Sequence, residues 1–327
     1  WHGCKPITDY RKYYFRYASE FGFQSFPCDK TIDSFALPED RNIFSYVMEK
    51  HQRNGSANGK IMTYLAQTFL YPGSFSTLLY ASQLLQADAI RYGVEHWRRN
   101  RGRCMGSIYW QINDCWPVAS WSSVDYFGRW KALHYAAKRF YAPVLLSCEE
   151  EGALDQLANL NAELWEPLRI SARLNVSNEQ RRTFVGTVRW ALRRSDGMPI
   201  REGEHEVSVP ELSAIWLDKL ELSDIDPYET YLSYELIENG SVLSRGTTLF
   251  CAPKHFRFAD PKLTLTRDGD ELRVKASAYA REVEIVCEDG DVLFSDNYFD
   301  LNADETTVKI VRGEGTRFSL RSVYDIR

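Results

Sequence analysis

The period of the hydrophobic pattern changes near residue 146, and this change limits the possible folds more than any other feature. In the second half, apolar and polar residues alternate, for example in Arg169–Val176 and Gly186–Leu192. A period of two is typical of antiparallel strands with one buried face. Asn239-Gly240 lies between two such runs and favours a tight hairpin. We therefore expect two immunoglobulin-like β-sandwiches, at 146–255 and 256–327.

The first half of the chain has a different order of elements. Its pattern predicts a short buried strand at Arg16–Gly22, a long helix at Ser74–Arg99, a second buried strand at Cys104–Trp110 and a helix at Trp130–Tyr141. Strands that alternate with helices are typical of α/β folds, which place functional residues at the carboxyl ends of their strands. Residues 1–145 are therefore expected to form part of an α/β domain.

Charge is distributed unevenly along the chain. Residues 1–145 hold 18 Lys and Arg against 11 Asp and Glu, a balance of +7, whereas residues 146–327 hold 22 against 34, a balance of −12. Because the basic residues of the first half are scattered, we expect no nucleic-acid partner. No apolar run is long enough to cross a bilayer as a helix, so we expect no membrane partner.

The seven cysteines are widely spaced and include no CxxC pair. The pattern predicts free thiols and no zinc site, and the six histidines show no metal-binding spacing. Free thiols favour a bacterial cytoplasmic protein. Three glycosylation sequons, at Asn54, Asn175 and Asn239, keep a secreted or lysosomal location as the alternative. We expect neither a metal nor an organic cofactor.

Glu20 is the strongest candidate for a catalytic residue. It is a carboxylate between aromatic and small residues near the end of the first predicted strand. A buried carboxylate is costly unless it has partners or a chemical use. One such use is nucleophilic attack in a retaining glycosidase, where a second carboxylic acid protonates the leaving oxygen. The alternative is a structural Glu that is hydrogen-bonded between strands.

Three residues at the end of the second predicted strand are candidates for substrate binding. Trp110 could stack its indole on the apolar face of a sugar, or it could be an ordinary core residue. Asn113 and Asp114 could bind sugar hydroxyls or brace the loop. Because aromatic residues and carboxylates stand together here, this segment is expected to form one wall of a sugar-binding cleft.

Three motifs carry a resemblance to a known family. SEFGFQS (Ser19–Ser25), YWQINDCWP (Tyr109–Pro117) and GRWKALHY (Gly128–Tyr135) closely resemble the β-mannosidases of glycoside hydrolase family 2. The resemblance implies that residues 1–145 are the C-terminal strands and helices of a catalytic (β/α)8 TIM barrel. It also implies that Glu20 is the nucleophile and that Trp110 closes the subsite for the terminal sugar.

The chain departs from this family in one respect. The general acid/base of such enzymes is a Glu preceded by Asn, on an earlier barrel strand than the nucleophile. The one Asn-Glu pair of this chain, Asn178-Glu179, lies in the β-rich half. The chain is therefore expected to be the C-terminal part of a β-mannosidase, without the acid/base and inactive by itself.

Two alternatives to a β-mannosidase remain open. One is another family 2 enzyme, such as a β-galactosidase or an exo-β-glucosaminidase. The other is a carbohydrate-binding module built from the sandwiches, without catalysis. The expected partners are β-mannoside oligosaccharides, the missing N-terminal half of the same enzyme and, in a homo-oligomer, further copies of the chain.

Overall fold

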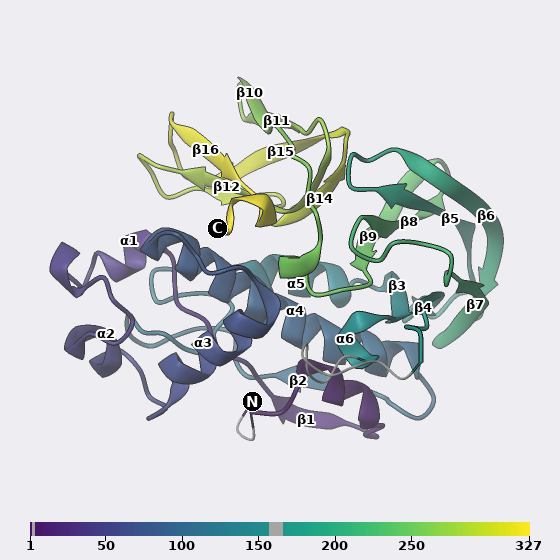
Figure 1. Ribbon diagram of the computed structural model, residues 1–327, viewed down its shortest axis with the longest axis horizontal. Helices are drawn as coiled ribbons and strands as arrows, with labels where there is room; N and C mark the ends of the chain where they lie inside the picture. The colour runs from purple at the N-terminus through teal and green to yellow at the C-terminus, as the bar shows by residue number, and fades with distance from the viewer. Residues whose placement is uncertain (2–3, 157–165) are drawn as a thin grey trace.

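The computed structural model describes residues 1, 4–156 and 166–327. Figure 1 shows a helical part at the left and two β-sheet parts at the top and right. The helices are α1 (Asp29–Ile32), α2 (Tyr46–Lys50), α3 (Ala57–Thr68), α4 (Phe75–Arg99), α5 (Ala132–Phe140) and α6 (Ala153–Gln156), with short 3₁₀ turns η1 (Ile7–Lys12), η2 (Pro38–Asp40), η3 (Pro253–His255) and η4 (Val323–Asp325).

Two short strands, β1 (Ala18–Phe21) and β2 (Ser107–Tyr109), form a parallel pair in the helical part. Ala18 pairs with Ser107 and Phe21 with Tyr109, with a shift of register between them. The prediction of two strands separated by a helical region is confirmed. Their predicted burial is wrong, because most of their side chains are exposed or only partly buried. The (β/α)8 barrel stays a prediction.

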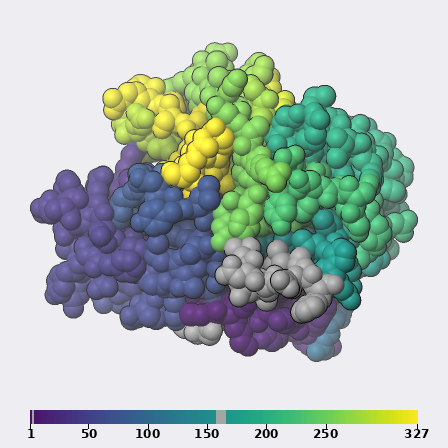
Figure 2. Space-filling view, in the orientation of Figure 1, coloured from purple at the N-terminus to yellow at the C-terminus, as the bar shows by residue number. Residues whose placement is uncertain are grey.

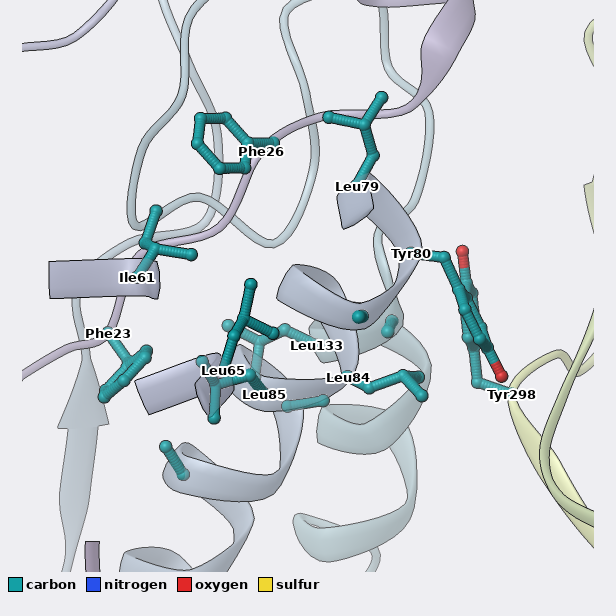
Figure 3. Close-up of a cluster of buried hydrophobic side chains, with 14 of the residues drawn as sticks. Phe23, Phe26, Ile61, Leu65, Leu79, Tyr80, Leu84, Leu85, Leu133 and Tyr298 are labelled. Atoms are coloured by element: carbon teal, nitrogen blue, oxygen red, sulfur yellow. The ribbon is translucent and has the colours of Figure 1, made fainter. Parts of the chain in front are cut away.

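Helix α4 is the longest element, and it forms the centre of the helical part. The predicted helix at Ser74–Arg99 is confirmed: the Ser74 hydroxyl accepts a hydrogen bond from the Thr77 amide at 3.1 Å, which caps the first turn. Figure 3 shows the core around this helix, where Leu84 and Leu85 pack with Leu133 of α5 and with side chains of α3. None of the helices in the described ranges is long and apolar enough to span a membrane.

The middle part of the chain is a sandwich of two antiparallel sheets. A shared core of buried side chains, including Leu146, Leu174, Val188 and Leu232, lies between them. The hairpin at Asn239-Gly240 is confirmed, since both residues have positive φ. One sheet has the order β3-β4-β7 and the other β6-β5-β8-β9, with bounds β3 (Val144–Glu151), β4 (Ser171–Asn178), β5 (Phe184–Arg194), β6 (Pro199–Val209), β7 (Ser213–Glu221), β8 (Thr230–Glu238) and β9 (Ser241–Leu249).

The C-terminal part is a second, smaller sandwich. Leu272 and Val308 of one sheet and Val283 and Leu301 of the other belong to one buried core. The sheets have the orders β10-β11-β15-β13 and β14-β12-β16, with bounds β10 (Thr264–Asp268), β11 (Glu271–Lys275), β12 (Tyr279–Cys287), β13 (Leu293–Phe294), β14 (Phe299–Asn302), β15 (Glu305–Arg312) and β16 (Phe318–Arg321).

The C-terminal sandwich is held against the helical part. Tyr80 of α4 and Tyr298 stack with their ring centroids 6.3 Å apart (Figure 3), and the Tyr80 hydroxyl donates to the Glu282 carbonyl at 2.5 Å. Near the chain's end, Val323 and Ile326 join the helical core. In Figure 2 this yellow segment lies directly against the blue helical part. The C-terminal part thus braces the helical part, in which β1 and β2 also lie.

Candidate active site

Glu20 and Trp110 lie side by side because β1 and β2 are parallel neighbours. The Trp110 amide donates a hydrogen bond to the Phe21 carbonyl at 2.7 Å, which continues the pairing beyond β2. Gly22 permits this approach: a Cβ atom there would lie 2.5 Å from the Trp110 carbonyl oxygen and 2.8 Å from the Trp121 ring. Any larger side chain at Gly22 would push Trp110 away from Glu20.

The side chain of Glu20 is exposed, and it accepts no hydrogen bond from the residues that the structure describes. Phe21, the next residue, packs against the helical core, so Glu20 points away from that core. The expectation of a buried carboxylate, and of a structural Glu bonded between strands, is therefore wrong. An exposed carboxylate without partners at a strand end is able to act on a ligand.

Trp110 has 48% of its surface exposed. An ordinary core tryptophan would be buried, so this interpretation of Trp110 is wrong. The preceding residue, Tyr109, turns the other way and holds the strand: its hydroxyl lies 2.8 Å from the Ser123 hydroxyl, which lies 2.9 Å from Nδ1 of His134. Strand β2 is thus anchored on one face while the Trp110 indole is accessible on the other.

Asp114 braces the loop that follows β2. It is buried, and its two carboxylate oxygens accept hydrogen bonds from the Ser120 hydroxyl at 2.7 Å and the Ser122 hydroxyl at 2.6 Å. The Gln111 side-chain amide donates a longer bond of 3.4 Å. Of the two roles considered for Asp114, the contacts support bracing, and a direct contact with substrate stays a prediction.

Asn113 is exposed beside this brace. Its side-chain amide donates only to the neighbouring Asp114 carbonyl, at 3.3 Å. The carbonyl oxygen of the Asn113 side chain accepts no hydrogen bond from the described residues. Asn113 therefore has free hydrogen-bonding capacity on the same loop as Trp110, and substrate binding by Asn113 stays a prediction.

A buried lysine that was not among the predicted site residues lies under the loop. Lys131 is buried, and its ammonium has one long contact with the described residues, 3.5 Å to the Ser25 carbonyl. Burial lowers the pKa of Lys131 to about 8, against the opposing effect of the Asp114 and Asp125 carboxylates. Lys131 thus gives the buried Asp114 a nearby positive charge.

The remaining carboxylate of the loop, Asp125, is also structural. One of its oxygens accepts the amides of Phe127 and Arg129, each at 2.9 Å, and the other accepts the Thr31 hydroxyl. Glu179, in the one Asn-Glu pair, is ion-paired with Arg101. Within the ranges that the structure describes, no three His, Cys, Asp or Glu side chains gather as a metal site requires.

A stack of side chains at the edge of this loop was also missed. Three separate segments supply it: the rings of Phe35, His51 and Trp116 stack in turn, and the Arg53 guanidinium lies over the Trp116 ring. The sequence offered one signal, a histidine and an arginine beside a Gly/Asn/Ser-rich loop, but nothing in it linked these residues to Trp116.

Two family models match the β-rich part of the chain. The model described as a mannosidase Ig/CBM-like domain matches residues 171–255, and the model described as an Ig-fold domain matches residues 258–326. The predicted immunoglobulin-like character of the two sandwiches is thereby confirmed.

Curated relatives extend the similarity to nearly the whole chain. Beta-mannosidase B of Thermothelomyces thermophilus is 27% identical over 99% of this chain, and Beta-mannosidase B of Aspergillus niger is 29% identical over 90%. Beta-mannosidase of Capra hircus is 36% identical over 40% of the chain. The chain spans only 40%, 36% and 16% of the length of these relatives. The predicted resemblance to β-mannosidases is confirmed.

Solved structures share the fold. The β-D-mannosidase from Dictyoglomus thermophilum superposes with a TM-score of 0.83 at 24% identity, over 98% of this chain and 39% of that one. The exo-chitosanase CsxA of Amycolatopsis orientalis superposes with a TM-score of 0.64 at 14% identity, over 98% of this chain and 42% of that one.

Proposed function

We propose that this relative of β-mannosidases supplies one wall of the active site of a retaining β-mannosidase, with Glu20 as the nucleophile. The observation that carries the proposal is the pairing of β1 with β2. It sets an exposed carboxylate, free of partners among the described residues, beside an accessible indole, that of Trp110. A sugar stacked on that indole would present its ring to the carboxylate.

The chemistry would follow the double-displacement scheme. A Glu20 oxygen attacks the anomeric carbon of a terminal β-D-mannose residue while a second carboxylic acid protonates the departing oxygen. The bond to the leaving group breaks and a covalent mannosyl-enzyme forms on Glu20. Water, deprotonated by the second residue, then attacks the same carbon and releases mannose with retained configuration. Neither step needs a metal or an organic cofactor.

We assign the acid/base role to a residue outside positions 1–327. The two carboxylates of the loop after β2, Asp114 and Asp125, are buried and already accept several hydrogen bonds. Glu179 is held by Arg101. These contacts leave none of the three available to protonate a leaving group near Glu20. Because the sequence has no further Asn-Glu pair, the chain by itself is proposed to be inactive.

We further propose that β1 and β2 are the last two strands of a (β/α)8 barrel of glycoside hydrolase family 2. A two-stranded sheet is rarely stable with its edges unpaired. Tyr17 beside β1 and Ile108 on β2 are 53% and 51% exposed, so apolar surface is available there for further strands to cover.

Covalent labelling tests the nucleophile. The protein that contains this chain together with the rest of the barrel would be treated with a 2-deoxy-2-fluoro-mannosyl fluoride, whose glycosyl-enzyme is long-lived. Mass spectrometry should find the label on Glu20. A label on any other residue would overturn the assignment.

Kinetics of a matched pair of variants complete the test. Glu20→Ala should lower kcat for 4-nitrophenyl β-mannoside by at least about 10⁴-fold, because removal of a nucleophile removes the covalent route. Glu202→Ala, at an exposed position on β6, should leave kcat unchanged. Turnover by residues 1–327 alone, at a rate close to that of the longer protein, would contradict the proposed origin of the acid/base.

A further inference from the structure

Four side chains form a continuous stack beside the proposed active site, and we call them the rim stack. The rings of Phe35 and His51 lie 3.7 Å apart and nearly parallel, at 6°. The His51 ring lies 4.9 Å from that of Trp116, and the Arg53 guanidinium covers the Trp116 ring at 4.4 Å. The order is therefore Phe35, His51, Trp116 and Arg53, with the arginine at one end.

The segment that carries Arg53 is held in place by its own hydrogen bonds. The Gln52 side-chain oxygen accepts the amides of Arg53 at 2.8 Å and Asn54 at 3.2 Å. The Gln52 side-chain nitrogen donates to Asn58 at 3.1 Å, and Nδ1 of His51 donates to the Pro117 carbonyl at 2.6 Å. Because the backbone is fixed on both sides, Arg53 is presented on a rigid turn and loses little entropy when it binds.

Backbone pairing places the rim stack at the same edge as Glu20. Beyond β1, Ser25 pairs with Ser120, and the neighbouring Ala119 pairs with Gln52. The extension of β1, the loop after β2 and the turn that carries Arg53 therefore lie next to one another. The first two continue from the carboxyl ends of the parallel strands, where Glu20 and Trp110 lie, and the turn that carries Arg53 is paired with the second of them.

Arg53 is exposed and has no carboxylate partner among the residues that the structure describes. Its planar group carries five N–H donors, and stacking on the Trp116 indole holds the group in place without using those donors. Phe44 and Tyr46, 55% and 75% exposed, lie on the chain segment just before the turn. Free N–H donors together with exposed aromatic side chains suit a ligand that has both hydroxyls and apolar C–H faces, which is a saccharide.

We propose that Arg53, stacked on Trp116, binds the leaving-group sugar of a β-mannoside oligosaccharide. This inference rests on the proposed function, because the terminal sugar would occupy the space between Glu20 and Trp110. Trp116 follows Trp110 along the same loop. A sugar that continues outward from the terminal residue then meets the rim stack, and Arg53 donates hydrogen bonds to its hydroxyls.

The test compares two substrates in the longer protein that contains this chain. β-1,4-Linked mannotriose has a sugar as its leaving group, and 4-nitrophenyl β-mannoside does not. For Arg53→Ala, the ratio of kcat/KM for mannotriose to kcat/KM for the aryl mannoside should fall about tenfold, as expected for a lost charge-assisted hydrogen bond. Arg53→Lys should restore only part of the ratio, because an ammonium lacks the planar fork.

The control is Arg312→Ala, at an exposed arginine on β15 of the C-terminal sandwich, which should leave the ratio unchanged. If the wild-type protein hydrolyses both substrates and Arg53→Ala leaves the ratio at its wild-type value, the rim inference is overturned while the proposed function stands. If the wild-type protein hydrolyses no β-mannoside, the proposed function itself fails, and the rim inference fails with it.

Discussion

The carboxyl group of Glu282 should make the stability of the folded protein depend on pH. It lies on β12 and lines a cavity of about 400 Å³ between α4, α5, β9 and the C-terminal sandwich. Burial raises the pKa of Glu282 to about 8, and the nearby Asp300 and Asp88 act in the same direction, against Arg281 and Arg139. Its amide donates to Asp300 at 2.8 Å, which keeps those two residues together.

The sign of the pH dependence follows from proton binding. Because the pKa of Glu282 is raised on folding from its ordinary value of 4.5 to about 8, the folded state holds a proton that the unfolded state releases. The stability contributed by Glu282 is fully present below pH 4.5 and is lost as the pH rises to about 8. At about 1.4 kcal/mol per pKa unit, the whole loss is at most about 5 kcal/mol.

Glu282→Gln removes this dependence, since the amide does not titrate. The midpoint of thermal unfolding, followed by circular dichroism, would be measured for both proteins between about pH 5 and pH 9. As the pH rises, the unfolding midpoint of the variant should increase relative to that of the wild type by up to roughly 10 °C. This value assumes roughly 2 °C for each kcal/mol of stability. Glu288→Gln, at an exposed position, is the matched control. A difference between Glu282→Gln and wild type that stays constant across this range would refute the reasoning.

Three further predictions concern folding of the chain and can be checked by denaturant unfolding. Gly22→Ala should cost about 1–3 kcal/mol, because its Cβ would overlap the Trp110 carbonyl, whereas Gly55→Ala, with nothing within 4 Å, should not. Asp114→Ala should cost about 3 kcal/mol, since it removes two serine hydrogen bonds and one of the two carboxylates near the Lys131 ammonium. Gly240→Ala should cost about 1 kcal/mol or more at its φ of 78°. In each case an unfolding midpoint equal to that of the wild type would contradict the assigned contact or conformation.

The proposed function also assigns a role to the neighbouring tryptophans, Trp116 and Trp121. Trp116 and Trp121 are only partly buried, and each contacts another group of the proposed site. Trp116 lies between His51 and Arg53, and Trp121 lies against Gly22. They shape the site by holding other groups in position, so substitutions there should act through Arg53 and Trp110.

Much of the fold follows from the sequence because the responsible interactions are local. Alternation along Gly186–Leu192 determines which face of β5 is buried, and Asn239-Gly240 tolerates the positive φ of a tight turn. Ser74 caps the helix that its own apolar pattern predicts. The neighbourhood of Glu20 and Trp110 was also predictable, since the carboxyl ends of consecutive parallel strands meet at one edge.

The tertiary structure alone decided what the side chains at that edge do. The bracing role of Asp114 depends on Ser120 and Ser122 turning back toward it, and a local pattern of residues does not encode that turn. Glu20 is exposed because no described element packs over its face of β1. Arg53 contacts Trp116 only in the folded chain, because the contact depends on the pairing of two segments that lie far apart in the sequence. Local propensity predicted the strands and helices, and long-range packing assigned the individual roles.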